Sequence, residues 1–258
     1  MVDLPAPDGP TIAAVEPRAT SNVTSSRMVS SPSGLLTFFV SRSARNTKSP
    51  VLMRKRLTVL VTLAALFVSA GASAAQTIVV VGDSLSSGYG LTAEQSWVAM
   101  LRERLDAEAY GYEVVNASIA GDTSAGGLAR LPRLLKEHSP AVVVIEIGGN
   151  DGLRGQPVET LRANLARMIE LSQQRGARVL LAGIQIPPNY GPAYTQALAA
   201  VYPALAKQYG TALVGFLLDG VALHPELMQH DGIHPNAAGQ KIVLENVWRV
   251  LPGVLRAQ

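Results

Sequence analysis

The 258-residue sequence contains no cysteine. Disulfides and thiolate metal sites are therefore excluded, and an oxidising compartment is neither required nor ruled out. The apolar run 57–68 is shorter than the roughly 20 residues that a membrane-spanning helix needs. Two phosphate-binding motifs are also absent, the dinucleotide-binding G-x-G-x-x-G and the P-loop G-x-x-x-x-G-K-[ST]. These two absences argue against a nucleotide-binding protein.

The N-terminal part differs in composition from the rest of the chain. Residues 1–50 are rich in Ser, Thr, Pro and Arg and show no sustained helical or strand period. Such a segment cannot bury enough apolar surface to offset its chain entropy. From Met53 the pattern changes to M-R-K-R, the apolar run 57–68 and the small-residue site Ala72-x-Ala74. These are the parts of a cleaved secretory signal peptide, with an uncleaved anchor as the alternative.

A signal peptide normally stands at the very N-terminus of a protein. We therefore expect translation to begin at Met53, so that residues 1–52 are non-native; a genuine disordered leader is the alternative. The signal peptide then covers residues 53–74 and the folded domain residues 75–258. This organisation predicts a periplasmic or secreted bacterial protein with no stable membrane insertion after signal removal. We expect the mature protein to be a monomer.

The formal net charge of +3 comes from the N-terminal part. Residues 1–74 hold eight of the 22 basic and three of the 19 acidic residues. Residues 75–258 therefore have 14 basic and 16 acidic residues and a net charge of −2. Because the basic excess lies outside the expected domain, it does not indicate nucleic-acid binding. The sequence predicts no nucleic-acid partner.

From Thr77 onwards, short apolar runs alternate with longer amphipathic segments, which is the βαβ pattern of a parallel sheet. The predicted strands are 77–81, 112–117, 141–147, 178–182 and 211–216. The predicted helices span 96–107, 157–174 and 192–209, and a last helix runs from Asn236 to before Pro252. In the helix 192–209, Pro203 is expected to cause a kink or a break. A further helix lies between the second and third strands; Asp122, Thr123 or Ser124 caps it, and its buried stripe consists of Leu128, Leu131, Leu134 and Leu135. We find no repeat and no linker in this region and expect one α/β domain.

Chemically active residue types gather where the predicted strands end. The segments are Gly82-Asp83-Ser84, Gly121-Asp122, Gly149-Asn150-Asp151 and, after the last strand, Asp231-Gly-Ile-His234. The carboxyl ends of parallel strands lie on one rim of the sheet, where open α/β sheets bind their ligands. We therefore expect these four segments to converge.

These residues provide the parts of a nucleophilic site. Ser84 is a weak nucleophile until a base takes its proton, and His234 is the candidate base because an imidazole titrates near neutrality. Asp231 stands close enough to orient the ring and to stabilise the imidazolium. The Ser84 and Gly121 backbone N–H groups and the Asn150 amide are candidate donors for an oxyanion.

Each residue also has a purely structural interpretation. Ser84 can cap a helix, Gly121 can be a turn glycine, Asn150 can bond its own turn, and Asp231 and His234 can form a turn before a helix. His230 is an alternative base. His230, Asp231 and His234 could be drawn as metal ligands, but nothing supports them with an outer shell, so we expect no metal and no cofactor.

In order and spacing, these four segments resemble the four blocks of the GDSL/SGNH hydrolase superfamily. The longer stretches N-A-S-I-A-G-D-T-S, E-I-G-G-N-D-G-L-R-G, P-P-N-Y-G and Q-H-D-G-I-H-P-N are similar to its periplasmic acyl-CoA thioesterase, arylesterase and lysophospholipase branch. The resemblance extends from Thr77 to the C-terminus. It implies a three-layer, flavodoxin-like α/β fold with about five parallel strands, Ser84, His234 and Asp231 as the catalytic triad, and Ser84, Gly121 and Asn150 as the oxyanion hole.

The resemblance also implies an activity. A serine esterase of this kind hydrolyses small carboxylic esters and acyl thioesters, such as aryl esters, acyl-CoA and lysophospholipids, through an acyl-enzyme on the serine. The G-x-S-x-G elbow of α/β-hydrolases is absent, because Ser86 stands where its second glycine would be. The segment Pro187–Gly191 matches a mobile loop beside the acyl groove. The alternatives are a carbohydrate acetylesterase or acyltransferase of the same superfamily, and a flavodoxin-like phosphate-binding or nucleotide-binding protein.

Overall fold

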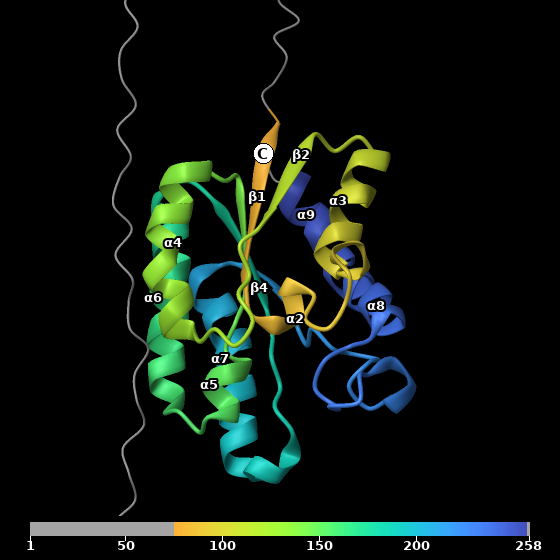
Figure 1. Cartoon of the computed structure of the whole chain (residues 1–258). Coiled ribbons are helices and arrows are strands. Elements are labelled where there is room, and N and C mark those ends of the chain that lie inside the picture. Colours follow the sequence, from red (N-terminus) through yellow and green to blue (C-terminus); the bar gives the residue numbers. More distant parts are fainter. Residues whose placement is uncertain (1–74, 257–258) are drawn as a thin grey trace, which may run out of the picture. The chain divides into compact units, whose positions relative to one another are not determined.

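The structure, a computed structural model, describes residues 75–256. The predicted leader, residues 1–52, and the predicted signal peptide, residues 53–74, lie outside this range. Strands and helices alternate along the described chain and form one sheet with helices on both of its faces (Figure 1). Within residues 75–256, no helix is both long and apolar enough to cross a membrane.

All five strands run parallel, in the order β2-β1-β3-β4-β5. Their bounds are β1 (Gln76–Gly82), β2 (Tyr112–Asn116), β3 (Val142–Glu146), β4 (Arg178–Ala182) and β5 (Ala212–Val214). The order reverses at β1, because β2 lies on one side of this strand and all later strands lie on the other. This is the flavodoxin-like order, in which ligands bind outside the strand ends beside the reversal. The predicted three-layer α/β fold is confirmed.

Two groups of helices cover the sheet (Figure 1). One group contains α4 (Ser124–His138), α6 (Val158–Gln174) and α7 (Pro192–Tyr209), which pack in this order. The other contains α3 (Trp97–Ala107), α8 (Ala237–Trp248) and α9 (Leu251–Arg256). Thr123 caps α4, and of the four leucines in the predicted stripe, Leu131 and Leu135 are buried and the other two are half-buried.

The central strands explain why their sequences are continuously apolar. The four residues from Ile78 to Val81 in β1 and the four from Val142 to Ile145 in β3 have no exposed surface. Both strands lie in the middle of a sheet that helices cover on both sides, so neither face can be polar. Complete burial of one such side chain contributes about 1.5–3 kcal/mol. The buried strands β1 and β3 therefore fix the positions of the residues that follow their carboxyl ends.

Three short helices and one proline differ from the sequence prediction. One of these helices is α9, which includes Pro252, whereas the last predicted helix was expected to end before this residue. The helices α2 (Ser84–Ser87) and α5 (Gly149–Leu153) follow β1 and β3, and they are too short to show a helical period in the sequence. Helix α7 continues through Pro203, so the predicted alternative of a break is wrong. The proline costs a backbone hydrogen bond, but side chains buried on both sides of it anchor the helix: Leu198, Val201, Tyr202 and Leu205.

Candidate active site

Ser84 lies at the point where β1 turns into α2. Its position depends on Gly82, because a Cβ there would lie 2.7 Å from Glu146 Oε2 and 2.8 Å from both Ser118 Oγ and Ser86 Cβ. Only glycine lets β1 end so close to these groups. The Asp83 carboxylate then caps the helix by accepting a hydrogen bond from Leu85 N–H at 3.1 Å. Ser84 is therefore the first residue of a helix fixed to the end of the central strand.

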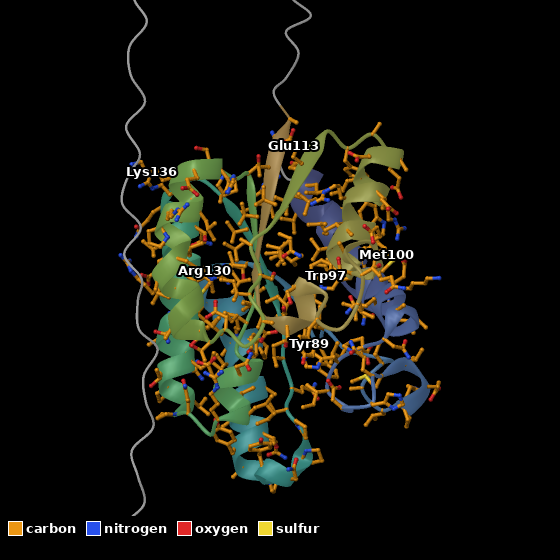
Figure 2. All side chains as sticks on the ribbon, in the orientation of Figure 1. Tyr89, Trp97, Met100, Glu113, Arg130 and Lys136 are labelled. Carbon is orange, nitrogen blue, oxygen red and sulfur yellow. The ribbon has the colours of Figure 1, made fainter. Side chains whose placement is uncertain are left out.

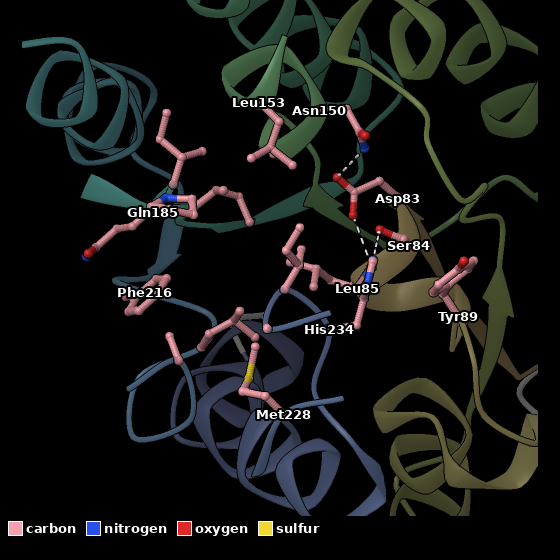
Figure 3. Close-up of a pocket in the computed structure, with 18 of the residues that line it drawn as sticks. Asp83, Ser84, Leu85, Tyr89, Asn150, Leu153, Gln185, Phe216, Met228 and His234 are labelled. Carbon is pink, nitrogen blue, oxygen red and sulfur yellow. Dashed lines mark hydrogen bonds between the residues drawn. The ribbon is translucent and has the colours of Figure 1, made fainter. Parts of the chain in front are cut away.

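A chain of hydrogen bonds joins Ser84 to His234 and Asp231. Figure 3 shows Ser84 and His234 side by side in this chain. His234 Nε2 lies 2.8 Å from Ser84 Oγ, and His234 Nδ1 lies 2.6 Å from Asp231 Oδ2. A carboxylate can only accept, so Nδ1 carries the ring proton and Nε2 is free to accept a proton from the serine. The three residues predicted as a triad are thus brought together in the geometry that proton abstraction requires.

Asp231 is held by more than the histidine ring. Its Oδ1 accepts hydrogen bonds from the backbone N–H groups of Ile233 at 2.9 Å and His234 at 3.0 Å. Partial burial raises the pKa of Asp231, but these hydrogen bonds and the one from the His234 ring outweigh burial and lower the pKa to about 2. Asp231 therefore stays ionised from neutral pH down to well below 5, and its charge is available to an imidazolium.

Two residues that the sequence prediction did not single out support the histidine. The Tyr89 ring lies against the His234 ring, with a centroid separation of 4.7 Å. Gln229 Nε2 donates to the backbone oxygens of Tyr89 at 2.8 Å and Pro235 at 3.1 Å, and Gln229 N–H donates to His234 O at 2.7 Å. These contacts join the loop after β1 to the loop before α8 over a separation of 140 residues, so no local sequence signal could have revealed them.

The candidate oxyanion donors come from the ends of three strands. Gly121, after β2, has a φ of +79°, which favours glycine, and Asn150 lies in α5 after β3. Arg130 on α4 holds the loop before Gly121, because its guanidinium donates to Ala117 O, to Gly82 O at 3.1 Å and to Asp122 Oδ2 at 2.8 Å (Figure 2). The predicted donors thus lie around Ser84 at one rim of the sheet, as the parallel topology requires.

Asn150 is fixed from two sides. Its Nδ2 donates to Asp83 Oδ2 at 3.2 Å, which is visible beside Ser84 in Figure 3. The next residue, Asp151, is buried and accepts hydrogen bonds from Ser124 N–H at 2.8 Å and Ser124 Oγ at 2.5 Å. Asp151 therefore ties α5 to the start of α4 and holds the turn that presents Asn150.

Ser84, Gly121, Asn150 and His234 form one end of a cavity of about 760 Å³. Its remaining wall is mainly apolar and includes Leu153, Ile184, Ile186, Phe216, Leu218 and Met228. Pro187 and Pro188 of the predicted loop also line it, and Tyr190 from the same loop donates to Leu153 O at 3.0 Å. A cavity of this size and lining holds a small organic ligand with its polar end at Ser84.

The other sequence candidates do not converge on this site. His230 is not among the residues that line the cavity, and the histidine whose Nε2 lies 2.8 Å from Ser84 Oγ is His234. Within residues 75–256, no group of three or more His, Asp or Glu side chains is placed to hold a metal ion. The hydrogen bonds from Asp231 through His234 to Ser84 instead indicate a hydroxyl that a neighbouring base can activate.

Comparison with known proteins identifies the family. The model of the GDSL-like lipase/acylhydrolase family matches residues 80–242. The chain belongs to this family. It is 58% identical over 183 residues to esterase TesA of Pseudomonas aeruginosa, an alignment that covers 71% of this chain and 91% of TesA. It is 44% identical over 174 residues to thioesterase 1/protease 1/lysophospholipase L1 of Escherichia coli K12, covering 67% and 82% of the two chains.

Solved structures agree with this membership of the GDSL-like family. A crystal structure of TesA has a TM-score of 0.68 and 58% identity, and the match covers 69% of this chain and 99% of TesA. The esterase EstA from Pseudoalteromonas, inhibited by monoethylphosphonate, has a TM-score of 0.67 and 38% identity, covering 70% and 98%. The predicted superfamily and the predicted hydrolase class, a serine esterase or thioesterase, are confirmed.

Proposed function

We propose that Ser84, His234 and Asp231 are the catalytic triad of this hydrolase. The observation that carries the proposal is the continuous hydrogen-bonded chain from Asp231 Oδ2 through both His234 nitrogens to Ser84 Oγ. It opens into a largely apolar cavity beside Gly121 and Asn150. The geometry supports this arrangement because each atom already occupies the place that acyl transfer needs before a substrate arrives.

The reaction follows from these positions. His234 Nε2 takes the proton of Ser84 Oγ while the oxygen attacks the carbonyl carbon of the ester or thioester. The carbonyl oxygen becomes an oxyanion, which the N–H groups of Ser84, Gly121 and the Asn150 amide stabilise, and Asp231 stabilises the imidazolium. His234 then returns the proton to the departing alcohol or thiol, leaving an acyl group on Ser84. Water activated by His234 attacks this acyl-enzyme in the same way and releases the acid.

The cavity favours a particular kind of acyl group. Its polar end is at Ser84, whereas the far wall is formed by aliphatic and aromatic side chains such as Ile186, Phe216 and Leu218. We expect the acyl chain to lie against this wall and the leaving group to point to solvent. Aryl esters, acyl thioesters and lysophospholipids all fit this requirement, and none of them needs a metal or cofactor. A carbohydrate acetylesterase binds only a two-carbon acyl group, which would leave most of this apolar wall without contact to the substrate.

The expected periplasmic or secreted location reduces the number of candidate substrates. If residues 53–74 are a cleaved signal peptide, the mature enzyme is a periplasmic or secreted monomer, where acyl-CoA is scarce. Esters and lysophospholipids are then the physiological substrates. Mass spectrometry of the protein from its natural host tests this, because the first observed peptide should begin near residue 75. Any peptide from residues 1–52 would refute translation from Met53.

A chain-length series tests the function. The values of kcat/KM for p-nitrophenyl esters of increasing acyl length, an acyl-CoA and a lysophospholipid are compared between the wild type and Ser84→Ala. We expect every activity to be lost in the variant and kcat/KM of the wild type to rise with chain length until the cavity is filled. Activity that survives in Ser84→Ala would refute the mechanism, whereas a preference for acetyl esters would favour the carbohydrate acetylesterase alternative.

A further inference from the structure

Two buried carboxyl groups behind Ser84 have no part in the triad or the oxyanion hole described above. Asp83 is 1% exposed and Glu146 has no exposed surface. Among the described residues, neither carboxyl forms an ion pair with a lysine or arginine. Burying a carboxyl group without a cation beside it lowers the stability of the folded protein. The presence of two such groups next to Ser84 therefore suggests that at least one of them has a function.

Asp83 uses both of its oxygens as acceptors, on two different elements. Oδ1 accepts from Leu85 N–H at 3.1 Å, and Oδ2 accepts from Asn150 Nδ2 at 3.2 Å. An amide nitrogen carries two hydrogens, so one is given to Asp83 and the other remains for the cavity. If the Asn150 amide were rotated by half a turn, its oxygen would face the Asp83 carboxylate and be repelled. The carboxylate therefore selects the orientation in which nitrogen, not oxygen, is available to an oxyanion.

We propose that Asp83 is a positioning residue that holds the Asn150 amide in its hydrogen-donating orientation at the oxyanion hole. This role rests on the proposed function and goes beyond helix capping, which needs only one acceptor. Only an ionised carboxylate accepts at both oxygens. An asparagine would cap α2 about as well as aspartate, but it would present one donor, either to Leu85 N–H or to Asn150.

Glu146 explains why Asp83 can hold the charge. Glu146 Oε2 accepts from Ser86 Oγ at 2.5 Å and contacts Asp83 N–H at 3.4 Å, whereas Oε1 is buried without a partner among the described residues. Burial, and then the nearby Asp83 charge, raises the pKa of Glu146 well above its ordinary value. Of the two carboxyls, Glu146 is therefore the one that takes up a proton more readily, which leaves Asp83 to carry the charge that Asn150 requires.

The charge on Asp83 depends on pH within the working range. Burial raises its pKa to about 6, although the hydrogen bonds from Leu85 and Asn150 and the nearby His234 lower it, and the more distant Asp122 raises it. The titratable groups that interact with Asp83 are Glu146 on β3, His234 before α8, Asp122 before α4 and the buried Tyr202 on α7. As pH falls through about 6, the Asp83 carboxylate takes up a proton. The protonated carboxyl has one fewer accepting oxygen, so its hydrogen bond from Asn150 Nδ2 is weakened or broken.

A double-mutant cycle tests the role. Asp83→Asn is made in the wild type and in Asn150→Ala, and kcat and KM for a soluble short-chain ester are measured at pH 8. We expect Asp83→Asn to lower kcat about 10-fold or more and to change KM less than about twofold. This is part of the roughly 10²–10³-fold loss in kcat that removal of an oxyanion donor causes. In Asn150→Ala the same substitution should have almost no further effect. An equal loss in both backgrounds, or no loss in the wild type, would overturn the proposal.

Two control variants sharpen the cycle. Glu146→Gln replaces the buried carboxyl by an amide of the same shape, and it should keep kcat within about twofold of the wild type, because Asn150 donates to Asp83 and not to Glu146. In the double variant Asp231→Asn/Asn150→Ala, the two losses in kcat should multiply, because Asp231 acts through His234 and not through Asn150. Thermal unfolding shows whether each variant folds. If Asp83→Asn does not fold, Asp83→Ser keeps the cap but cannot reach Asn150, and the same kcat loss is expected.

A spectroscopic measurement separates this inference from the proposed function. In a His234→Ala variant, which lacks the histidine titration, the side-chain amide signal of Asn150 is followed by NMR from pH 4.5 to 8 and assigned by its absence in Asn150→Ala. We expect it to titrate with a midpoint somewhat above the wild-type value of about 6, because His234 lowers the pKa of Asp83 and is absent here, and to stop titrating when Asp83→Asn is added. A signal that ignores pH would overturn the positioning role even if Ser84→Ala proves inactive. Conversely, the titration would remain if another residue proved to be the nucleophile.

Discussion

Replacing Asp231 by asparagine tests how the site sets the protonation of His234. The two backbone N–H groups of Ile233 and His234 both point at Asp231 Oδ1. In Asp231→Asn these two donors require the amide oxygen, so the NH₂ group must take the place of Oδ2, which lies 2.6 Å from His234 Nδ1. A donor at that place forces Nδ1 to accept, and the ring proton then moves to Nε2.

A proton on Nε2 prevents His234 from taking the proton of Ser84. The expected loss in kcat is about 10⁴-fold, as in serine hydrolases with the same tautomer change, and this corresponds to about 5 kcal/mol of transition-state stabilisation. KM should change little, because Asp231 does not face the acyl wall. The assay is the hydrolysis of a short p-nitrophenyl ester at pH 8, with thermal unfolding as a check on folding.

The matched control is another acid beside a histidine. Glu226 Oε1 lies 3.2 Å from Nδ1 of His224, a residue that lines the cavity, so Glu226→Gln alters a similar pair outside the proposed triad and should leave kcat unchanged. A loss of less than 10-fold in Asp231→Asn would refute the reasoning. It would mean that the histidine tautomer is set by another group or that His234 is not the base.

Three further predictions concern the same site. Asn150→Ala should lower kcat by about 10²–10³-fold, and an unchanged kcat would remove this residue from the oxyanion hole. Because the pKa of Asp231 is about 2, this residue stays ionised and adds nothing to the pH dependence between pH 5 and 8. The pKa of Asp83 is about 6, so kcat/KM should fall as pH drops through this value, and a flat profile from pH 5 to 8 would count against a role for the Asp83 charge. Gly82→Ala should lower the free energy of unfolding by about 1–3 kcal/mol, since its methyl group would lie 2.7–2.8 Å from three buried atoms, whereas Gly253→Ala, with open space around it, is the control.

The sequence was sufficient to predict the fold and to name the residues of the proposed triad. Continuous β-branched runs such as 78–81 predict strands buried on both faces, and a parallel sheet places all their carboxyl ends on one rim. The residues after those ends carry the family blocks, so Ser84, Gly121, Asn150, Asp231 and His234 were predicted by number. Each of these signals is local, because a strand period, a turn glycine or a short motif is complete within about ten residues.

The supporting residues could be found only in the tertiary structure. Asp83 and Asn150 are 67 positions apart, and Ser86 and Glu146 are 60 positions apart, yet each pair shares a hydrogen bond. No local pattern distinguishes Asp83 as a partner of Asn150 from Asp83 as a helix cap. The sequence by itself determined which groups could react, because their chemistry resides in each side chain. Only the folded sheet decided their orientation and charge, since burial and hydrogen-bond geometry depend on groups that the chain brings together from distant strands.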